Sequence, residues 1–190
     1  MRKSKQETAK TRERIVRAAA GEFREHGIVA TGLADLMAAA GLTHGGFYRH
    51  FDSKDQVVAE ACALAVAEVT QSVAATGSTK KGRKGLEAAV SAYLSPQHRD
   101  NCRDGCPIAA LGSELARADE ETRAKATEGF MKLVSFLADR FEEAKMSDAR
   151  KRAVVAATTM IGAMTISRIV SDEVLSASIL NSAKDGITRQ

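Results

Sequence analysis

Residues 31–51 read TGLADLMAAAGLTHGGFYRHF and predict two short helices, over 32–40 and 44–50, joined by a tight turn. Gly41 can adopt the left-handed backbone conformation that stops the first helix, because it has no Cβ to clash. Thr43 can then cap the second helix with its hydroxyl. Two short helices joined by a turn of three residues have the spacing of a helix-turn-helix unit.

The second short helix has two faces of different character. Phe47 and Phe51, four residues apart, share one face, which we expect to be buried. The other polar side chains remain available to a nucleic acid: His44, Tyr48, Arg49 and His50. On an isolated helix such a cluster would suit a solvated surface at least as well, so the choice depends on the rest of the chain.

The distribution of charge favours the nucleic-acid interpretation. The net charge of the 190 residues is only +4, with 28 basic and 24 acidic side chains. Residues 1–54 carry ten Lys/Arg against six Asp/Glu, and the remaining 136 residues carry 18 of each. The whole positive excess therefore lies beside the predicted turn, where phosphates would be bound.

The sequence on either side of this unit predicts two further helices. The first is expected to begin with Thr11 as its cap and to end at Gly27. Its apolar stripe is flanked by four arginines: Arg12, Arg14, Arg17 and Arg24. After the unit, Ser53-Lys54-Asp55-Gln56 is a capping box, in which Ser53 and Gln56 each satisfy a backbone donor. A helix from Ser53 into the low seventies is predicted.

Residues 10–60 resemble the TetR family of bacterial transcriptional repressors. The resemblance is carried by the arginine-flanked first helix and by Thr31, Asp35-Leu36, Ala40-Gly41-Leu42-Thr43, Gly45, Phe47-Tyr48-Arg49-His50-Phe51 and Ser53-Lys54. It implies that the second short helix enters the major groove and that Tyr48, His50 and Lys54 hold phosphates. It also implies phosphate or base contacts at Thr31 and Thr43.

Two positions depart from the family pattern. Met37 stands where the family often has Ala at the closest helix crossing, which changes the expected angle between the short helices. Gly46 has no side chain at a common base-reading position, which leaves more of the reading to His44 and Thr43. The predicted DNA-binding residues are Thr31, Thr43, His44, Gly45, Gly46, Tyr48, Arg49, His50 and Lys54.

The remainder of the chain also has helical periodicity, so we expect an all-α protein with 1–54 as the DNA-binding domain and 55–190 as a larger helical domain. Residues 76–85 are rich in Gly, Ser, Thr and Lys and predict a mobile connection, and 97–105 predict a loop. The other expected helices are 86–95, 107–117, 119–144, 148–171 and 173–184.

The TetR resemblance implies two roles for the second domain: dimerisation and the binding of a small-molecule effector. The helices at 119–144 and 148–171 are the candidates for a four-helix interface between two copies. Their apolar faces would alternatively complete the core of one copy. An effector pocket is expected among the helices of 55–117 and this long pair. An architectural DNA-binding protein would need little of this C-terminal mass.

No segment predicts membrane insertion or secretion. The longest apolar run, Ala61–Ala67, has seven residues, against the ~18 that span a bilayer. The basic N-terminus leads into polar residues and not into an apolar stretch, so a cytoplasmic protein with free thiols is expected.

Cys106 and Cys102 suggest a redox or electrophile sensor. If Pro107 starts a helix, Cys106 is its N-cap, where the helix dipole and the nearby Arg99 and Arg103 favour a thiolate. Cys102 would be the resolving partner. The alternative function is an all-α enzyme with Cys106 as nucleophile, but the sequence supplies it with no base, and no metal ligand set or cofactor motif is evident.

Overall fold

The computed structural model describes residues 5–189, and helices make up this part of the chain without any strand. The all-α prediction is confirmed. The elements in order are α1 (Lys5–His26), α2 (Leu33–Ala39), the 3-10 helix η1 (His44–Arg49), α3 (Lys54–Ser78), α4 (Gly82–Tyr93), α5 (Pro96–Asp100), α6 (Pro107–Leu115), α7 (Glu120–Glu143), α8 (Ala149–Ile169) and α9 (Glu173–Thr188).

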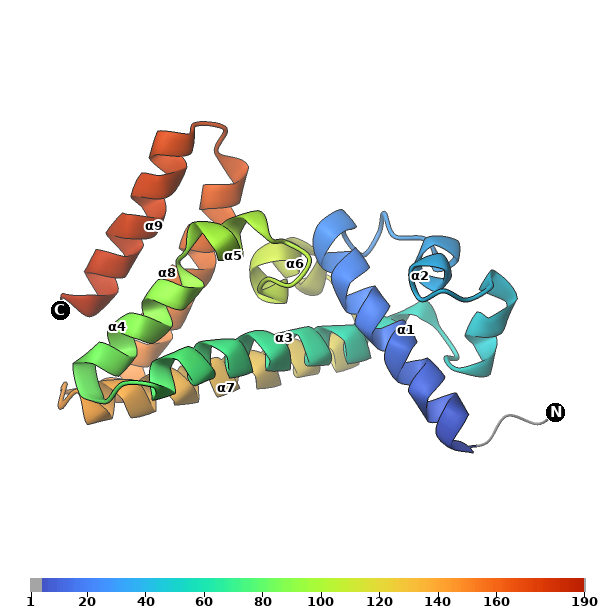
Figure 1. Cartoon of the computed structure of the whole chain (residues 1–190), viewed down its shortest axis with the longest axis horizontal. Coiled ribbons are helices and arrows are strands. Elements are labelled where there is room, and N and C mark those ends of the chain that lie inside the picture. Colours follow the sequence, from blue (N-terminus) through green and yellow to red (C-terminus); the bar gives the residue numbers. More distant parts are fainter. Residues whose placement is uncertain (1–4, 190) are drawn as a thin grey trace.

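The helices form a small head and a longer body (Figure 1). α1, α2 and η1 make the head, and α3 runs from it into the body alongside α7. α8 packs on α7, and α9 packs on α8 at the end of the molecule far from the head. α4 lies against α3 and α7. A change inside the body can therefore reach the head through α3 or through the elements that touch α1.

Two apolar clusters stabilise these parts. The head cluster joins α1, α2 and η1 to the first half of α3, and Leu111 and Leu115 of α6 complete it. The body cluster joins the second half of α3 to α4, α7, α8 and α9. α3 belongs to both clusters, so it couples the two parts mechanically.

α3 is also long and apolar enough to cross a membrane by length and composition alone. It packs against α1, α4, α6 and α7, and its inward side is buried in the two clusters. A core helix of this kind passes the same test, and the packing assigns α3 to the core.

Several predicted helix boundaries were wrong. α1 begins at Lys5, so Thr11 lies inside the helix, where its hydroxyl donates to the carbonyl oxygen of Glu7 at 2.8 Å. Residues 44–49 form a 3-10 helix and not an α-helix, and Thr43 at its N-cap makes no side-chain capping bond. α5 occupies part of the predicted loop 97–105, with the Ser95 hydroxyl accepting from the His98 N–H.

The predicted mobile connection at 76–85 is mostly helical, because α3 ends at Ser78 and α4 begins at Gly82. Two of its three glycines, Gly77 and Gly85, allow close packing. A Cβ on Gly85 would lie 2.5 Å from the carbonyl oxygen of Lys80, and one on Gly77 would lie 3.0 Å from Ala89 and Phe136. Glycines that allow α3 and α4 to approach each other have the same composition signal as a flexible linker, so the prediction of a mobile connection was wrong.

Candidate nucleic-acid interface

The turn between α2 and η1 forms as the sequence predicts. Gly41 has a φ of +65°, the left-handed conformation that lets α2 end there. Phe47 and Phe51 are both buried, and their rings stack with centroids 5.6 Å apart. η1 is therefore fixed to the head on one side, and its other side is left to the solvent.

The solvent side of η1 presents five of the predicted DNA-binding residues together. Tyr48 is 68% exposed and rests edge-on against Phe47, and the others are exposed as well: Thr43, His44, Gly45 and Arg49. We call this set the η1 face. It offers a phenol, an imidazole, a hydroxyl and a guanidinium on one surface, the groups that contact phosphates and base edges.

Gly46 and His50 lie at the edge of the η1 face and are half-buried. The Met37 side chain lies 3.5 Å from where a Cβ on Gly46 would be, so the two departures from the family pattern are neighbours. The carbonyl oxygen of His50 accepts a hydrogen bond from Arg12.

Thr31 is not part of this surface. It is 3% exposed, its hydroxyl donates to the carbonyl oxygen of Gly27 at 2.7 Å, and its N–H donates to the same oxygen at 3.3 Å. Both of its donors close the turn after α1, and a nucleic-acid contact by Thr31 stays a prediction. The Lys54 ammonium group donates to the carbonyl oxygen of Ile28 at 2.5 Å, which ties the start of α3 to the same turn.

Arg12 is a residue whose role the sequence did not reveal. Its guanidinium lies 4.0 Å from the centroid of the Phe51 ring, and it also bonds the His50 carbonyl and the Glu60 carboxylate. It thus fixes α1 to η1 and to α3. The sequence marks Arg12 only as one of four arginines beside the apolar stripe of the first helix, and nothing in the pattern separates it from the other three.

Comparison with known proteins identifies the chain. A family model described as bacterial regulatory proteins, tetR family, matches residues 15–61, and one described as transcriptional regulator LmrA/YxaF-like, C-terminal domain, matches residues 83–175. The protein belongs to the TetR family. A Mycobacterium tuberculosis HTH-type transcriptional regulator, Rv0196, is 30% identical over 169 residues, which cover 85% of this chain and 86% of that protein.

Solved structures show the same fold over the whole TetR-family chain. A TetR regulator from Chloroflexus aurantiacus covers 97% of this chain and 95% of its own, with 25% identity and a TM-score of 0.81. The reduced form of Escherichia coli NemR covers 95% of this chain and 96% of its own, with 21% identity and a TM-score of 0.80.

The cysteine segment of this TetR protein differs from its predicted arrangement. Cys106 is the N-cap residue of α6, as predicted, but it is only 4% exposed and makes no side-chain capping bond. Arg99 pairs with Asp100, and Arg103 pairs with two glutamates of α1. The cation near Cys106 is instead Arg24.

The two cysteines of the predicted redox pair have different neighbours. The Cys106 thiol lies near Cys62 and Tyr93, whereas the Cys102 thiol contacts the carbonyl oxygen of Arg99 at 3.9 Å. Burial and the neighbouring Cys106 raise the pKa of Cys62 to about 11, so Cys62 stays a neutral thiol. None of these contacts brings the Cys102 thiol close to the Cys106 thiol.

His98 approaches Cys106, although the two residues are eight apart in the sequence and no local pattern predicts the contact. Its Nε2 accepts the backbone N–H of Cys106 at 2.9 Å, and its Nδ1 lies 2.7 Å from the carbonyl oxygen of Tyr93. Both ring nitrogens are therefore occupied by backbone groups, and neither is placed to take a proton from the thiol. Among residues 5–189 there is no group of three His, Cys, Asp or Glu side chains able to hold a metal ion.

The two helices predicted to form the dimer interface differ in the apolar side chains that they expose. The apolar face of α7 is used inside the monomer, where Leu137 is fully buried. Six large apolar side chains of the body are instead at least 40% exposed on or beside α8 and α9: Val154, Val155, Ile166, Ile169, Val174 and Leu175. We call this set the α8/α9 face. The apolar face of the helix at 119–144 completes the core of the monomer, and which helices meet a second copy stays a prediction.

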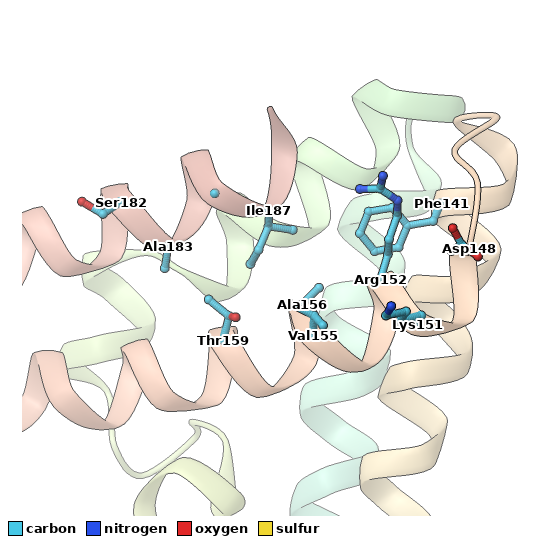
Figure 2. A pocket seen from close by; sticks show the side chains of 11 residues that line it. Phe141, Asp148, Lys151, Arg152, Val155, Ala156, Thr159, Ser182, Ala183 and Ile187 are labelled. Carbon is cyan, nitrogen blue, oxygen red and sulfur yellow. The ribbon is translucent and has the colours of Figure 1, made fainter. Parts of the chain in front are cut away.

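A pocket of about 380 Å³ lies between α7, α8 and α9 (Figure 2). Ala183 and Ile187 of α9 face Ala156 and Thr159 of α8 across it. Lys151, Arg152 and Asp148 line its end near Phe141. Val155 belongs both to this pocket and to the α8/α9 face, so the pocket adjoins that exposed apolar surface.

Proposed function

We propose that this TetR-family regulator is a cytoplasmic repressor that binds a palindromic operator as a homodimer and leaves it when a small-molecule effector binds. The η1 face is the observation that carries the proposal. It is exposed, it lies on the second helix of a helix-turn-helix unit, and the buried Phe47 and Phe51 hold it in place. In this proposal residues 1–54 bind DNA, and residues 55–190 dimerise and bind the effector.

The α8/α9 face supports a homodimer. An exposed apolar surface of this kind marks an interaction site, because contact of apolar side chains with water costs free energy that burial against a partner recovers. Gly162 on α8 and Gly186 on α9 have no atoms within 4 Å of where a Cβ would be, so the monomer does not require glycine there. A second copy packed closely against both helices would require a residue without a side chain at these two positions. Two copies joined this way present two heads to half-sites on one side of the duplex.

Selection from a random duplex library tests the DNA-binding role. Enrichment of a two-fold symmetric sequence, with half-sites about 34–36 Å apart, is expected. Arg49→Ala should abolish or weaken the enrichment, and Arg123→Ala, which removes an exposed arginine of α7, should leave it unchanged. Recovery of random sequence by the wild-type protein would overturn the proposal.

Oxidation of Cys106 remains the alternative trigger for release. Its support is the nearness of the thiol to Arg24, which belongs to α1 of the head. Its weakness is burial, because an oxidant must first open the start of α6. Treating the operator complex with peroxide or a quinone separates the triggers. Release that persists equally in Cys106→Ser and Cys102→Ser excludes the thiol.

A further inference from the structure

A cleft of about 500 Å³ lies between α3, α4, α5 and the segment that leads to α6. Its volume is in the range of small-molecule sites. Part of its wall is apolar, from Val69, Val73 and Ala92. The rest is polar and includes two carboxylates, Glu68 and Asp104.

The Glu68 carboxylate also holds two arginines of α1. The Arg17 Nη1 lies 2.6 Å from Glu68 Oε1, and the Arg24 Nη2 lies 3.9 Å from Oε2. Asp104 is a further electrostatic partner of Arg24. The same acidic groups that face the cleft therefore attach the head to the body.

Arg24 is the buried part of this attachment. It is 6% exposed, and its Nη1 donates to the carbonyl oxygen of Gly105 at 3.0 Å. Burial lowers the pKa of Arg24, and Glu68, Asp104 and Cys106 act in the opposite direction. A buried guanidinium depends on its anionic partners, because removing them leaves an uncompensated charge away from water.

The same segment is attached to α1 a second time. Arg103 Nη1 lies 2.8 Å from Glu22 and 2.7 Å from Glu25. Arg103 and Arg24 thus join residues 103–105 to one side of α1, close to where Asn101 and Asp104 line the cleft. A displacement of this segment therefore acts directly on α1.

A buried hydroxyl beneath the cleft has only a weak partner. Tyr93 lines the cleft and is fully buried, and its hydroxyl makes no hydrogen bond of ordinary geometry within the described residues. Its neighbour is the Cys106 thiol, a weak hydrogen-bonding group.

We propose that this cleft binds a small organic cation with an apolar body and that the cation competes with Arg17 and Arg24 for Glu68 and Asp104. The apolar body lies on Val69, Val73 and Ala92, and the positive group meets the two carboxylates. Loss of these partners weakens the attachment of Arg24, one of the two attachments between α1 and residues 103–105, while the pairs of Arg103 with Glu22 and Glu25 stay in place. The proposal rests on the proposed function, because the head whose attachment it weakens is the DNA-binding part.

Binding to the protein alone tests the ligand class, independently of DNA. Calorimetry with phenylbutylamine, phenylbutanol and phenylbutyrate compares a cation, a neutral molecule and an anion of similar shape. The amine should bind at least about tenfold more tightly than the other two, since only the amine can make a charge-assisted contact with the carboxylates. Equal binding of all three, or no binding of the amine at millimolar concentration, overturns the proposal.

Two variants test the site. Glu68→Gln and Asp104→Asn should each reduce amine affinity about tenfold or more and leave phenylbutanol affinity unchanged. Glu87→Gln on α4 removes an exposed carboxylate outside the cleft and should change neither. Asp104→Asn, which breaks no α1 ion pair of Glu68, keeps the test valid if Glu68→Gln folds poorly. Unchanged amine affinity in both variants overturns the proposal.

Operator binding then tests the coupling. The amine should weaken DNA binding by the same factor by which DNA weakens amine binding, because linkage is reciprocal. Amine binding without any effect on the operator complex overturns the release step. If no operator binds at all, calorimetry still decides whether the cleft takes a cation, so the two failures are distinguishable.

Discussion

His98 Nε2 accepts the backbone N–H of Cys106 at 2.9 Å, which joins α5 to the N-cap residue of α6. The other ring nitrogen bonds the Tyr93 carbonyl oxygen, so the ring is neutral with its proton on Nδ1. Protonation of Nε2 would place a second N–H against that of Cys106. The contact therefore exists only while His98 is uncharged.

This contact predicts a loss of stability in mild acid. Burial lowers the pKa of His98 below its ordinary value of 6.5, and the nearby Arg168 and Arg24 lower it further, although the Tyr93 bond opposes them. The unfolded chain then binds the extra proton first, so the free energy of unfolding falls as the pH drops below 6.5. The slope from one such proton is at most about 1.4 kcal/mol per pH unit.

Urea unfolding at several pH values measures this effect. His98→Gln keeps an amide donor and acceptor but does not titrate, so its stability should depend less steeply on pH. His44→Gln, on the exposed η1 face, is the control and should behave as the wild type. A His98→Gln profile parallel to the wild type would contradict the assignment.

The η1 face predicts two different classes of DNA-binding variant. Tyr48→Ala and Lys54→Ala should weaken binding to all duplexes about tenfold, Tyr48 by loss of a phosphate contact and Lys54 also by loosening the start of α3. His44→Ala should instead change the preference among operators. Wild-type affinity should fall about 10³-fold or more between about 50 and 200 mM salt.

Fluorescence anisotropy on the selected operator and on single-base variants measures both effects. Thr31→Val serves as a further comparison, because the buried Thr31 should affect stability and not the salt slope. An affinity that does not change with salt concentration would exclude a complex held mainly by phosphate contacts.

The α8/α9 face predicts that charge on α8 dissociates the dimer. Ile166→Glu places a carboxylate on a side chain that is 47% exposed in the monomer, so the monomer should fold and the dimer should not form. Leu137→Glu, by contrast, buries a charge in the core and should unfold the chain. Sedimentation and circular dichroism separate these outcomes. A monomeric wild type at micromolar concentration would contradict the proposal.

The sequence correctly predicted the features that are set by interactions between residues close together in the chain. Gly41, Pro107 and the Phe47–Phe51 spacing correctly placed the turn, the start of α6 and the buried side of η1, because each acts over a few residues. The Ser53 hydroxyl caps α3 as predicted, but Gln56 reaches back to the N–H of Asp52 and not to that of Ser53.

Tertiary contacts set the rest, and one sequence does not reveal them. The approach of His98 to Cys106 depends on the short helix α5, which was predicted as loop. The exposed side of α8 is decided by what α7 and α9 leave uncovered. Thr31 matched a family position, yet the turn after α1 uses both of its donors.

The crossing of α3 and α7 predicts a steric pair. A Cβ on Gly129 of α7 would overlap the Val66 side chain of α3, and both residues are buried. Gly129→Ala should therefore lower the free energy of unfolding by about 1–3 kcal/mol, despite the better helix propensity of Ala. Val66→Ala in the same chain removes the obstructing methyl groups, so the double variant should recover part of that loss.

Urea unfolding at one fixed protein concentration measures the four members of this cycle, since dimerisation makes stability depend on concentration. The control is Gly112→Ala on α6, where no atom lies within 4 Å of a new Cβ. It should be neutral or stabilise by up to about 1 kcal/mol, because Ala favours the helix. Additive effects of Gly129→Ala and Val66→Ala would show that the two residues do not touch, and the close approach of α3 to α7 would be wrong.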